Sequence, residues 1–208
     1  MAIRHDFIES ESDGVLYCHH ALFVPLLTLL EVLWGENIAF GIEAEPTCHT
    51  LIESAGEEAR GRLDILITAY KKGADEPAYP ILLYEAKAPG SILPEEWAAA
   101  YKTNVIDDND ARDSALNTYS DAETPSLKGN SFQISRQLRK YMSGFLSRRI
   151  VCGDGQNLVG VRLTPKQLEK CASGTDLSAS IFVETRPSRF LQTLFSVALE
   201  GLLESGLL

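Results

Sequence analysis

The amino-acid sequence predicts an α/β fold, with a central mixed β-sheet flanked by helices. Two apolar segments of strand length, residues 62–70 and 79–88, are separated by a short polar connection, as in a β-hairpin. Residues 16–34 and 131–148 instead carry apolar side chains at helical spacing. Because such helices and strands must each bury an apolar face, the pattern indicates helices packed on one sheet.

Chain length favours one domain spanning residues 1–208. With 208 residues and 45% apolar side chains, the chain can bury a substantial core. Residues 104–130 differ from the rest, because six acidic side chains lie there among Asn, Ser and Thr with few large apolar groups. We therefore expect an acidic, mobile insertion at about residues 104–130.

The N-terminal part of the chain predicts a helix, a strand and a turn before the hairpin. The helix over residues 16–34 is expected to end at Gly35 and to lie in the core. Alternating apolar residues over 38–42 predict a strand, which residues 50–52 either extend or follow. The polar residues 54–61 are then interpreted as a turn.

The C-terminal part predicts three helices, a hairpin and a strand. Pro94 to Trp97 opens a short helix, since proline is permitted in the first turn. The helix over residues 131–148 is the most basic region of the chain. Residues 150–163 predict a hairpin that turns at a glycine pair, and residues 180–183 a further strand. Residues 190–203 form an amphipathic pattern typical of a final helix.

Composition also bears on the location and partners of the protein. The first residues are acidic, unlike those of a secretory signal, so we expect an intracellular protein, cytoplasmic or nuclear. Pro25 and Glu31 interrupt the most apolar stretch, so we expect no membrane span. Four scattered cysteines lack the paired spacing of a zinc site. A net charge of −10 argues against a simple cationic DNA-coating protein.

Three ionisable residues interrupt the apolar strands. Glu85 and Lys87 are two positions apart, so both side chains should point to the same face of the strand. Asp64 occupies a similar position in the preceding strand. Burying ionisable groups costs several kcal/mol unless they are paired or bind a metal. These residues therefore indicate a shared metal site.

The order of these elements and motifs resembles the PD-(D/E)XK nuclease superfamily. The resemblance covers roughly residues 16–148 and includes Asp64, the Glu-x-Lys sequence at residues 85–87, and the Gln-x-x-x-Tyr sequence at residues 137–141 that is similar to RecB-type nuclease domains. Leu63 stands where the family often has proline. The resemblance implies a restriction-endonuclease-like core.

Membership of this superfamily would give each residue a role in phosphodiester hydrolysis. The carboxylates of Asp64 and Glu85 and the backbone carbonyl of Ala86 would bind Mg²⁺ or Mn²⁺, because these hard cations prefer oxygen ligands. Lys87 would orient or help deprotonate the attacking water and stabilise developing negative charge. Gln137 would position a phosphate or the surroundings of the nucleophile.

The resemblance further implies a nucleic-acid partner and one more metal ligand. The residues expected to contact nucleic acid lie on the basic helix: Arg136, Gln137, Arg139, Lys140 and Tyr141. Relatives in this superfamily add an upstream histidine or a glutamate on the first helix. The sequence leaves this ligand open, and the choices are His19, His20, Glu31 and Glu45, with Glu31 included in the expected metal set.

Three functions follow, of which the first is a metal-dependent nuclease, acting on DNA rather than RNA. A second is an inactive nuclease-fold module that binds nucleic acid or protein, since a fold does not determine a function. The third is an interaction protein that forms a homodimer through its C-terminal helix. Taken singly, a Glu-x-Lys pair is more often a solvated ion pair, and a glutamine and tyrosine four residues apart often only cover a helix face.

Overall fold

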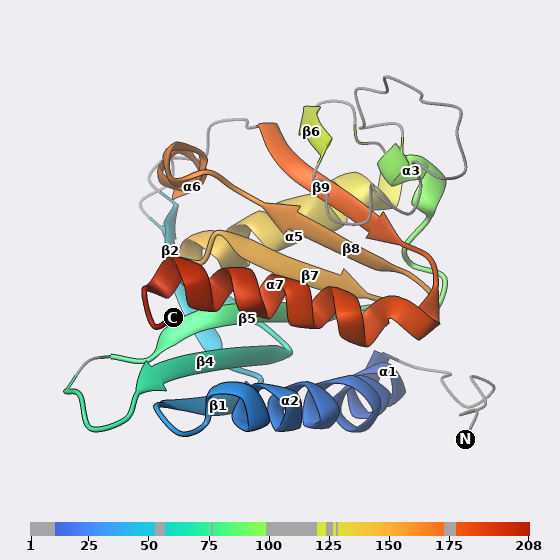
Figure 1. Ribbon diagram of the computed structural model, residues 1–208. Coiled ribbons are helices and arrows are strands. Elements are labelled where there is room, and N and C mark those ends of the chain that lie inside the picture. Colours follow the sequence, from blue (N-terminus) through green and yellow to red (C-terminus); the bar gives the residue numbers. More distant parts are fainter. Residues whose placement is uncertain are drawn as a thin grey trace.

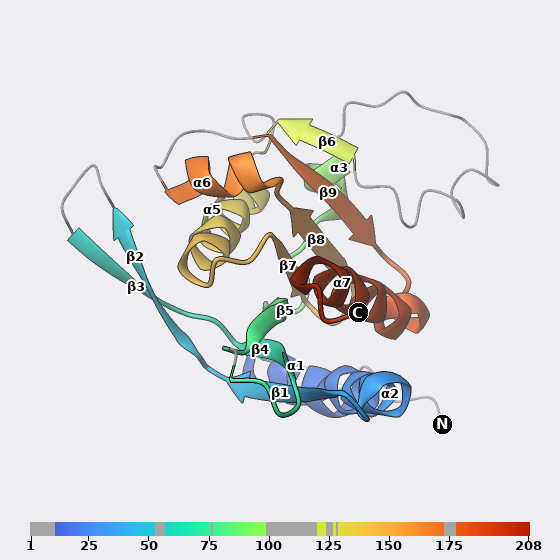
Figure 2. The same cartoon turned by 60° about the vertical axis from the view of Figure 1, so that its left-hand side comes forward.

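A computed structural model of the protein describes residues 11–52, 57–75, 77–98, 120–123, 127, 129–172 and 178–208. It confirms the predicted α/β class. A mixed seven-stranded sheet has helices on both of its faces, and a separate two-stranded hairpin extends from one side (Figures 1 and 2).

The large sheet has the strand order β1-β4-β5-β7-β8-β9-β6. Its strands are β1 (Ile38–Ala44), β4 (Ile65–Lys71), β5 (Tyr79–Ala86), β6 (Ser120–Glu123), β7 (Arg149–Gly153), β8 (Leu158–Arg162) and β9 (Ser178–Glu184). β5 and β7 pair in parallel, whereas the other neighbouring pairs are antiparallel. A parallel pair needs a crossover connection, and the chain between β5 and β7 supplies it with helices on one face of the sheet.

One face of the sheet is covered by the N-terminal helical segment and the C-terminal helix (Figure 1). The segment consists of α1 (Glu11–Cys18), a π-helical turn η2 (His19–Phe23) and α2 (Val24–Trp34). Its core side chains recur every four residues: Cys18, Leu22, Leu26 and Leu30. A four-residue spacing drifts roughly 40° per repeat around an α-helix. The wider π turn compensates for part of this drift and keeps these four side chains facing the sheet.

This N-terminal helical segment differs from the sequence prediction in two respects. It begins at Glu11, rather than at residue 16. Pro25 does not interrupt it, because proline lies in the first turn of α2. The stretch Val15–Trp34 is long and apolar enough to cross a membrane by length and composition alone. Part of its surface packs in the core, including Phe23 and Leu26, neither of which has measurable solvent exposure.

The opposite face is covered by α3 (Pro94–Ala98), α5 (Gly129–Gly144) and α6 (Pro165–Ala172). Ile134 and Leu138 of α5 belong to the same buried cluster as Leu83 of β5. The Glu96 carboxylate of α3 accepts a hydrogen bond from the Ser131 N–H at 2.8 Å, which satisfies a free amide in the first turn of α5. α5 ends four residues earlier than predicted, and β7 begins shortly after it.

The sequence did not predict the separate hairpin as such, of which it indicated only strand at residues 50–52, nor the helix α6. β2 (Thr47–Ile52) and β3 (Glu57–Arg62) form the separate antiparallel hairpin, so most of the predicted turn 54–61 is strand. α6 was missed because its eight residues are mainly polar. Both elements depend on contacts with other parts of the chain rather than on a strong local pattern.

Much of the predicted acidic insertion, residues 104–130, lies outside the described residues. The part that the structure describes includes β6, which pairs antiparallel with β9 at the edge of the sheet, and the start of α5. Backbone pairing with β9 defines this strand. The polar composition therefore gave no sign of it.

The C-terminal helix α7 (Phe190–Ser205) packs its apolar side onto the sheet of its own chain. Leu194, Ala198 and Leu202 have no measurable exposure. At Gly201 the helix backbone comes so close to β5 that an added Cβ would lie 2.5 Å from the Ile81 carbonyl oxygen. A homodimer through α7 would therefore have to use its outward-facing side.

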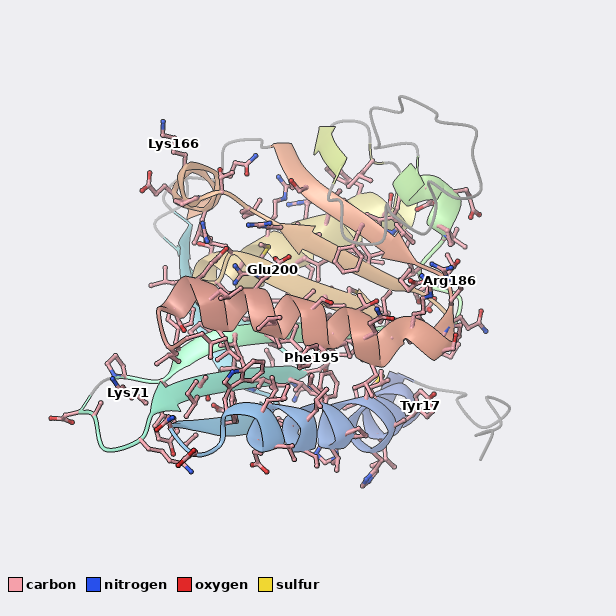
Figure 3. All side chains as sticks on the ribbon, in the orientation of Figure 1. Tyr17, Lys71, Lys166, Arg186, Phe195 and Glu200 are labelled. Atoms are coloured by element: carbon pink, nitrogen blue, oxygen red, sulfur yellow. The ribbon has the colours of Figure 1, made fainter. Side chains whose placement is uncertain are left out.

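An ion-pair cluster holds the C-terminal end of α7 to β7 and β8. Figure 3 labels one of its members, Glu200 of α7. The Arg149 side chain, 2% exposed, contacts Glu204 and lies with its Nε 3.4 Å from Glu200 Oε2. Arg148 also contacts Glu204, and Arg162 lies 3.6 Å from it. Burial alone would raise the pKa of Glu204, but hydrogen bonds and positive charge from Arg148 and Arg149 outweigh this and lower it.

We expect Arg149→Met to lower the free energy of unfolding by about 1–3 kcal/mol, because it removes a buried cation from two half-buried carboxylates, Glu200 and Glu204. Arg162→Met is the matched control. Arg162 contacts the same two glutamates but is 40% exposed, so its loss should cost less than about 1 kcal/mol. Urea unfolding at neutral pH measures both, and equal losses would contradict the role given to Arg149.

The lowered pKa of Glu204 also predicts a pH dependence. A carboxylate whose pKa is lower in the folded state stabilises the protein above its unfolded pKa, and this contribution is lost as the pH falls through the folded value. Glu204→Gln should therefore reduce stability at neutral pH, and the difference from wild type should shrink below a pH of about 4.5. Thermal melts across a pH series test this.

Candidate functional site

Three of the four predicted catalytic residues, Asp64, Glu85 and Lys87, lie where β4 begins and β5 ends, and the fourth, Gln137, lies on α5. The antiparallel register pairs Ile65 with Tyr84, which brings Asp64 beside the end of β5. The Ala86 N–H donates a hydrogen bond of 2.6 Å to Asp64 Oδ2. The Asp64 side chain is therefore held at the backbone between Glu85 and Lys87.

Glu85 is a buried carboxylate in an otherwise apolar strand. It is only 3% exposed, and its Oε1 accepts hydrogen bonds from Lys87 Nζ at 2.6 Å and from Gln137 Nε2 at 2.7 Å. A buried carboxylate costs several kcal/mol unless it is paired and hydrogen-bonded, and a cation and an amide provide that pairing here. The predicted Glu-x-Lys pair thus lies inside the protein, not on a solvated edge.

Gln137 and Tyr141 extend this network from α5. One helical turn apart, they are linked by a hydrogen bond of 2.8 Å from Gln137 Nε2 to the Tyr141 hydroxyl. The hydroxyl in turn donates to the Arg62 carbonyl at 2.7 Å. The ring also packs on Gly61, where an added Cβ would lie 2.9 Å from a ring carbon. This network joins α5 to both β5 and β3.

The environment of Tyr141 keeps its phenol protonated. Burial raises its pKa to about 12, and the negative charges of Glu85 and Asp64 add to this, while the Gln137 hydrogen bond and the charge of Lys87 act in the opposite direction. At neutral pH the hydroxyl is therefore a neutral donor. It can hold the Arg62 carbonyl without carrying charge itself.

The loop that follows Lys87 is fixed to the turn between β7 and β8. The Lys87 N–H donates to the Gly153 carbonyl at 2.8 Å. Asp154, 1% exposed, accepts from the Ile92 N–H at 3.0 Å, and Asn157 Nδ2 donates to the Ile92 carbonyl at 3.2 Å. Asp154 was not predicted to position this loop, although it stands in a Gly-Asp-Gly turn that the sequence does indicate.

Glu31 lies far from the other expected metal ligands. It is exposed near the end of α2, where its carbonyl accepts from the Gly35 N–H. Gly35 contacts Lys72, which follows β4, whereas Asp64 precedes that strand. The seven residues of β4 span roughly 20 Å. The structure therefore does not bring Glu31 to Asp64 and Glu85.

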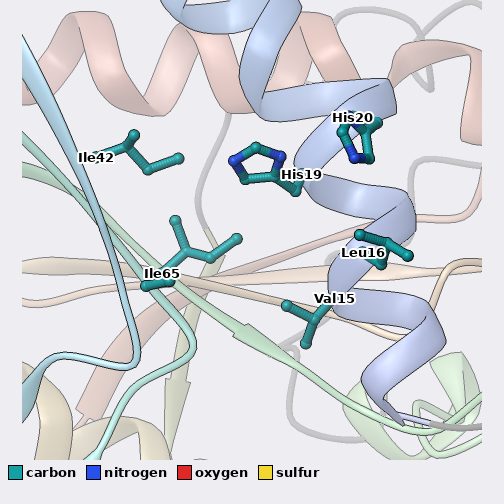
Figure 4. Close-up of a pocket in the computed structure, with 7 residues that line it drawn as sticks. Val15, Leu16, His19, His20, Ile42 and Ile65 are labelled. Atoms are coloured by element: carbon teal, nitrogen blue, oxygen red, sulfur yellow. The ribbon is translucent and has the colours of Figure 1, made fainter.

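The other upstream candidates lie closer to Asp64 but in different surroundings. The Glu45 N–H donates to the Asp64 carbonyl at 2.9 Å, while its exposed carboxylate lies 3.6 Å from Arg62. His19 and His20 line an apolar pocket beside Ile65 (Figure 4). Within the described ranges, no three His, Cys, Asp or Glu side chains gather closely enough to hold a metal ion.

The donors present nevertheless suit a hard divalent cation. Mg²⁺ in enzymes is commonly held by one or two carboxylates, and water and substrate phosphate complete its coordination. Asp64, just before β4, and Glu85 of β5 are two such carboxylates, and the Ala86 carbonyl is the third oxygen that the family resemblance implied. Their chemistry fits Mg²⁺ or Mn²⁺ better than a softer metal such as zinc, which favours Cys and His.

The basic residues of α5 differ in their exposure to solvent and in their neighbours. Arg136 is exposed and lies with its guanidinium carbon 5.9 Å from the centre of the Phe132 ring. Lys140 is half-buried, and its side chain lies beside Gly61 of β3. Arg139 is also half-buried. Tyr141 is 4% exposed and so lies in the core, not on the surface that nucleic acid would contact.

We expect Tyr141→Phe to lower the free energy of unfolding by about 1–2 kcal/mol, because it removes the donor to the Arg62 carbonyl and the acceptor for Gln137. Tyr141→Ala should cost about 3–5 kcal/mol, since it also leaves a cavity. Arg136→Ala, an exposed change on the same helix, should stay within about 0.5 kcal/mol of wild type. Denaturant unfolding would show whether the hydroxyl contributes.

Comparison of the chain with models of protein families, with curated proteins and with solved structures found no match. Evidence for a function therefore comes from the residues themselves. The most informative of them are Asp64, Glu85, Lys87 and Gln137, which the structure joins through backbone and side-chain hydrogen bonds at one end of β5.

Proposed function

We propose that the protein is a metal-dependent nuclease that hydrolyses phosphodiester bonds, in DNA rather than RNA. The observation that carries the proposal is the buried Glu85 carboxylate, held by Lys87 and Gln137 beside Asp64. An apolar side chain would stabilise this strand position at least as well as a buried ion pair. A catalytic role gives a reason for placing charge there.

The proposal extends to a restriction-endonuclease-like core. It is supported by the antiparallel β4–β5 pair that presents the carboxylates and by the parallel β5–β7 pair. Further support comes from α5, which lies in the crossover between β5 and β7 and supplies Gln137 to the same carboxylate. These features match the order of elements on which the sequence resemblance rests.

Each residue of the network would have a distinct part in the reaction. A bound Mg²⁺ or Mn²⁺ would neutralise phosphate charge and supply an activated water. Asp64 and Glu85 would hold the cation. The Lys87 ammonium, already 2.6 Å from Glu85 Oε1, would turn to a phosphate oxygen or to the attacking water and stabilise developing negative charge. Gln137 would act as a positioning residue, because its amide orients Glu85.

An inactive binding module is the second candidate, and one observation favours it. Asp64 already accepts from a backbone amide, and Glu85 already accepts from Lys87 and Gln137. Such a network could simply fasten β4, β5 and α5 together. In that case the basic residues of α5 would still offer contacts to the phosphate backbone of nucleic acid without cleavage.

Cleavage assays with metal separate the two candidates. We expect wild-type protein to cleave fluorescent DNA with Mg²⁺ or Mn²⁺ and to be inactive with chelator. Lys87→Ala should lower the single-turnover rate by roughly a hundredfold or more, about 2.7 kcal/mol of transition-state stabilisation. Lys71→Ala is the matched control, because Lys71 is exposed at the far end of β4 (Figure 3).

A metal-binding measurement gives a second readout that does not depend on cleavage. Asp64→Asn and Glu85→Gln keep the shape of each side chain but remove its charge, so each should weaken Mn²⁺ binding in isothermal titration calorimetry by at least about tenfold. A Lys87→Ala variant that retains wild-type cleavage would overturn the mechanism. Absence of both Mn²⁺ binding and cleavage in the wild type would favour the binding module.

A further inference from the structure

A pocket of about 520 Å³ lies between the N-terminal helical segment and the ends of β1 and β4. Figure 4 shows the His19 imidazole extending from the helix toward Ile42 and Ile65. His20 follows on the same helix, with the two ring centres 5.1 Å apart and their planes nearly perpendicular, at 84°. Both histidines belong to the π turn, a type of turn that often occurs at functional sites.

The pocket adjoins the carboxylate site. Ile65, which forms one wall, follows Asp64 in the chain, and its partner Ala44 forms another part of the lining. Cys18, the residue before His19, is buried, which raises its pKa to about 11, and the negative charge of Asp64 adds to this effect. The end of α1 thus lies within electrostatic reach of the Asp64 carboxylate.

The lining of the pocket indicates what kind of group it would accept. Its walls are aliphatic apart from the two imidazoles, and no Asp, Glu, Lys or Arg is among the lining residues. A phosphate pocket would need cationic or amide donors, and within the described residues no third ligand joins the histidines to hold a metal. A planar group with apolar faces and polar edges suits aliphatic walls and an aromatic ring. Nucleobases have these properties and commonly stack on histidine and other aromatic side chains.

We propose that this pocket binds the nucleobase of a nucleotide next to the phosphodiester held at Asp64 and Glu85. The inference rests on the proposed nuclease function and specifies its substrate. A base can enter such a pocket only when it is unstacked from its neighbours. The substrate is therefore a single strand, a frayed end or a flipped nucleotide, and not an intact stretch of duplex.

Nuclear magnetic resonance of the histidine side chains tests binding without any cleavage. The chain has four histidines, so their ring signals can be assigned by single substitutions. Titration with thymidine 5′-monophosphate should shift the His19 and His20 signals, whereas deoxyribose 5′-phosphate, which lacks the base, should leave them in place. Equal shifts with both compounds, or no shift with either, would overturn the proposal.

Abasic substrates test the same pocket during turnover. In single-stranded DNA, one abasic nucleotide placed beside the cleaved bond should lower the wild-type rate about tenfold, as expected when one stacking contact is lost. His19→Ala should lower the rate on normal DNA by a similar factor and respond little to the abasic site. The two effects would then be non-additive, as for groups in direct contact.

Two further variants separate stacking from other roles of His19. His19→Phe keeps an aromatic ring but cannot bind a metal, so it should retain most activity and the sensitivity to the abasic nucleotide. Ala44→Trp should fill the pocket and remove that sensitivity, whereas Val32→Trp, at a position of α2 that is 77% exposed, should not. Loss of all cleavage in His19→Phe would overturn the nucleobase role.

These measurements distinguish failure of the pocket from failure of the proposed function. Cleavage that requires metal and Lys87 but is insensitive to the abasic nucleotide would leave the nuclease proposal intact and overturn the pocket. Base-dependent shifts of His19 and His20 without any cleavage would support the pocket and overturn the nuclease proposal. Duplex cleaved away from its ends as fast as single strands would also overturn the inference about the substrate.

Discussion

The hydrogen bonds to the buried Glu85 carboxylate are the interaction on which the site and much of one face of the sheet depend. Lys87 and Gln137 donate to the same oxygen, and Gln137 passes the connection through Tyr141 to the backbone of β3. One acidic side chain thereby links β5, α5 and the hairpin strand. In a weakly polar interior, each of these groups depends on the others for its partner, so the network orders the site as a unit.

The two faces of the sheet have different physical roles. One is packed with aliphatic side chains from the N-terminal segment and α7, and it is secured by the ion pairs of Arg149. The other carries α5 with its polar connections to Glu85. Burial of apolar side chains on the first face stabilises the fold and so offsets the free-energy cost of burying the Glu85 carboxylate. The face under α5 also has an apolar core, but it includes the charged and polar groups around Glu85, which packing alone would not select.

The sequence was most predictive where a local pattern decides the outcome. Alternation in the strands placed Glu85 and Lys87 on one face, and helical spacing placed Gln137 and Tyr141, which the family resemblance had singled out, on one side of a helix. It was least predictive where distant segments decide. Residues 57–62 form a strand because β2 pairs with them, and Glu31 lies away from the site because α2 ends at the opposite end of β4. Neither fact follows from spacing along the chain.

The hydrogen bonds that hold the Ile92 backbone affect how the loop after β5 can move. Asp154 and Asn157 hold both the amide and the carbonyl of Ile92, while the Gly153 carbonyl holds the amide of Lys87. The loop after β5 and the turn after β7 therefore share their hydrogen bonds, and we expect them to open as one cooperative unit. The Ile92 amide, which lies in neither of the paired strands, becomes a natural reporter of that opening by hydrogen exchange. Slow exchange there would mean that the lysine end of the site is rigid on the same timescale.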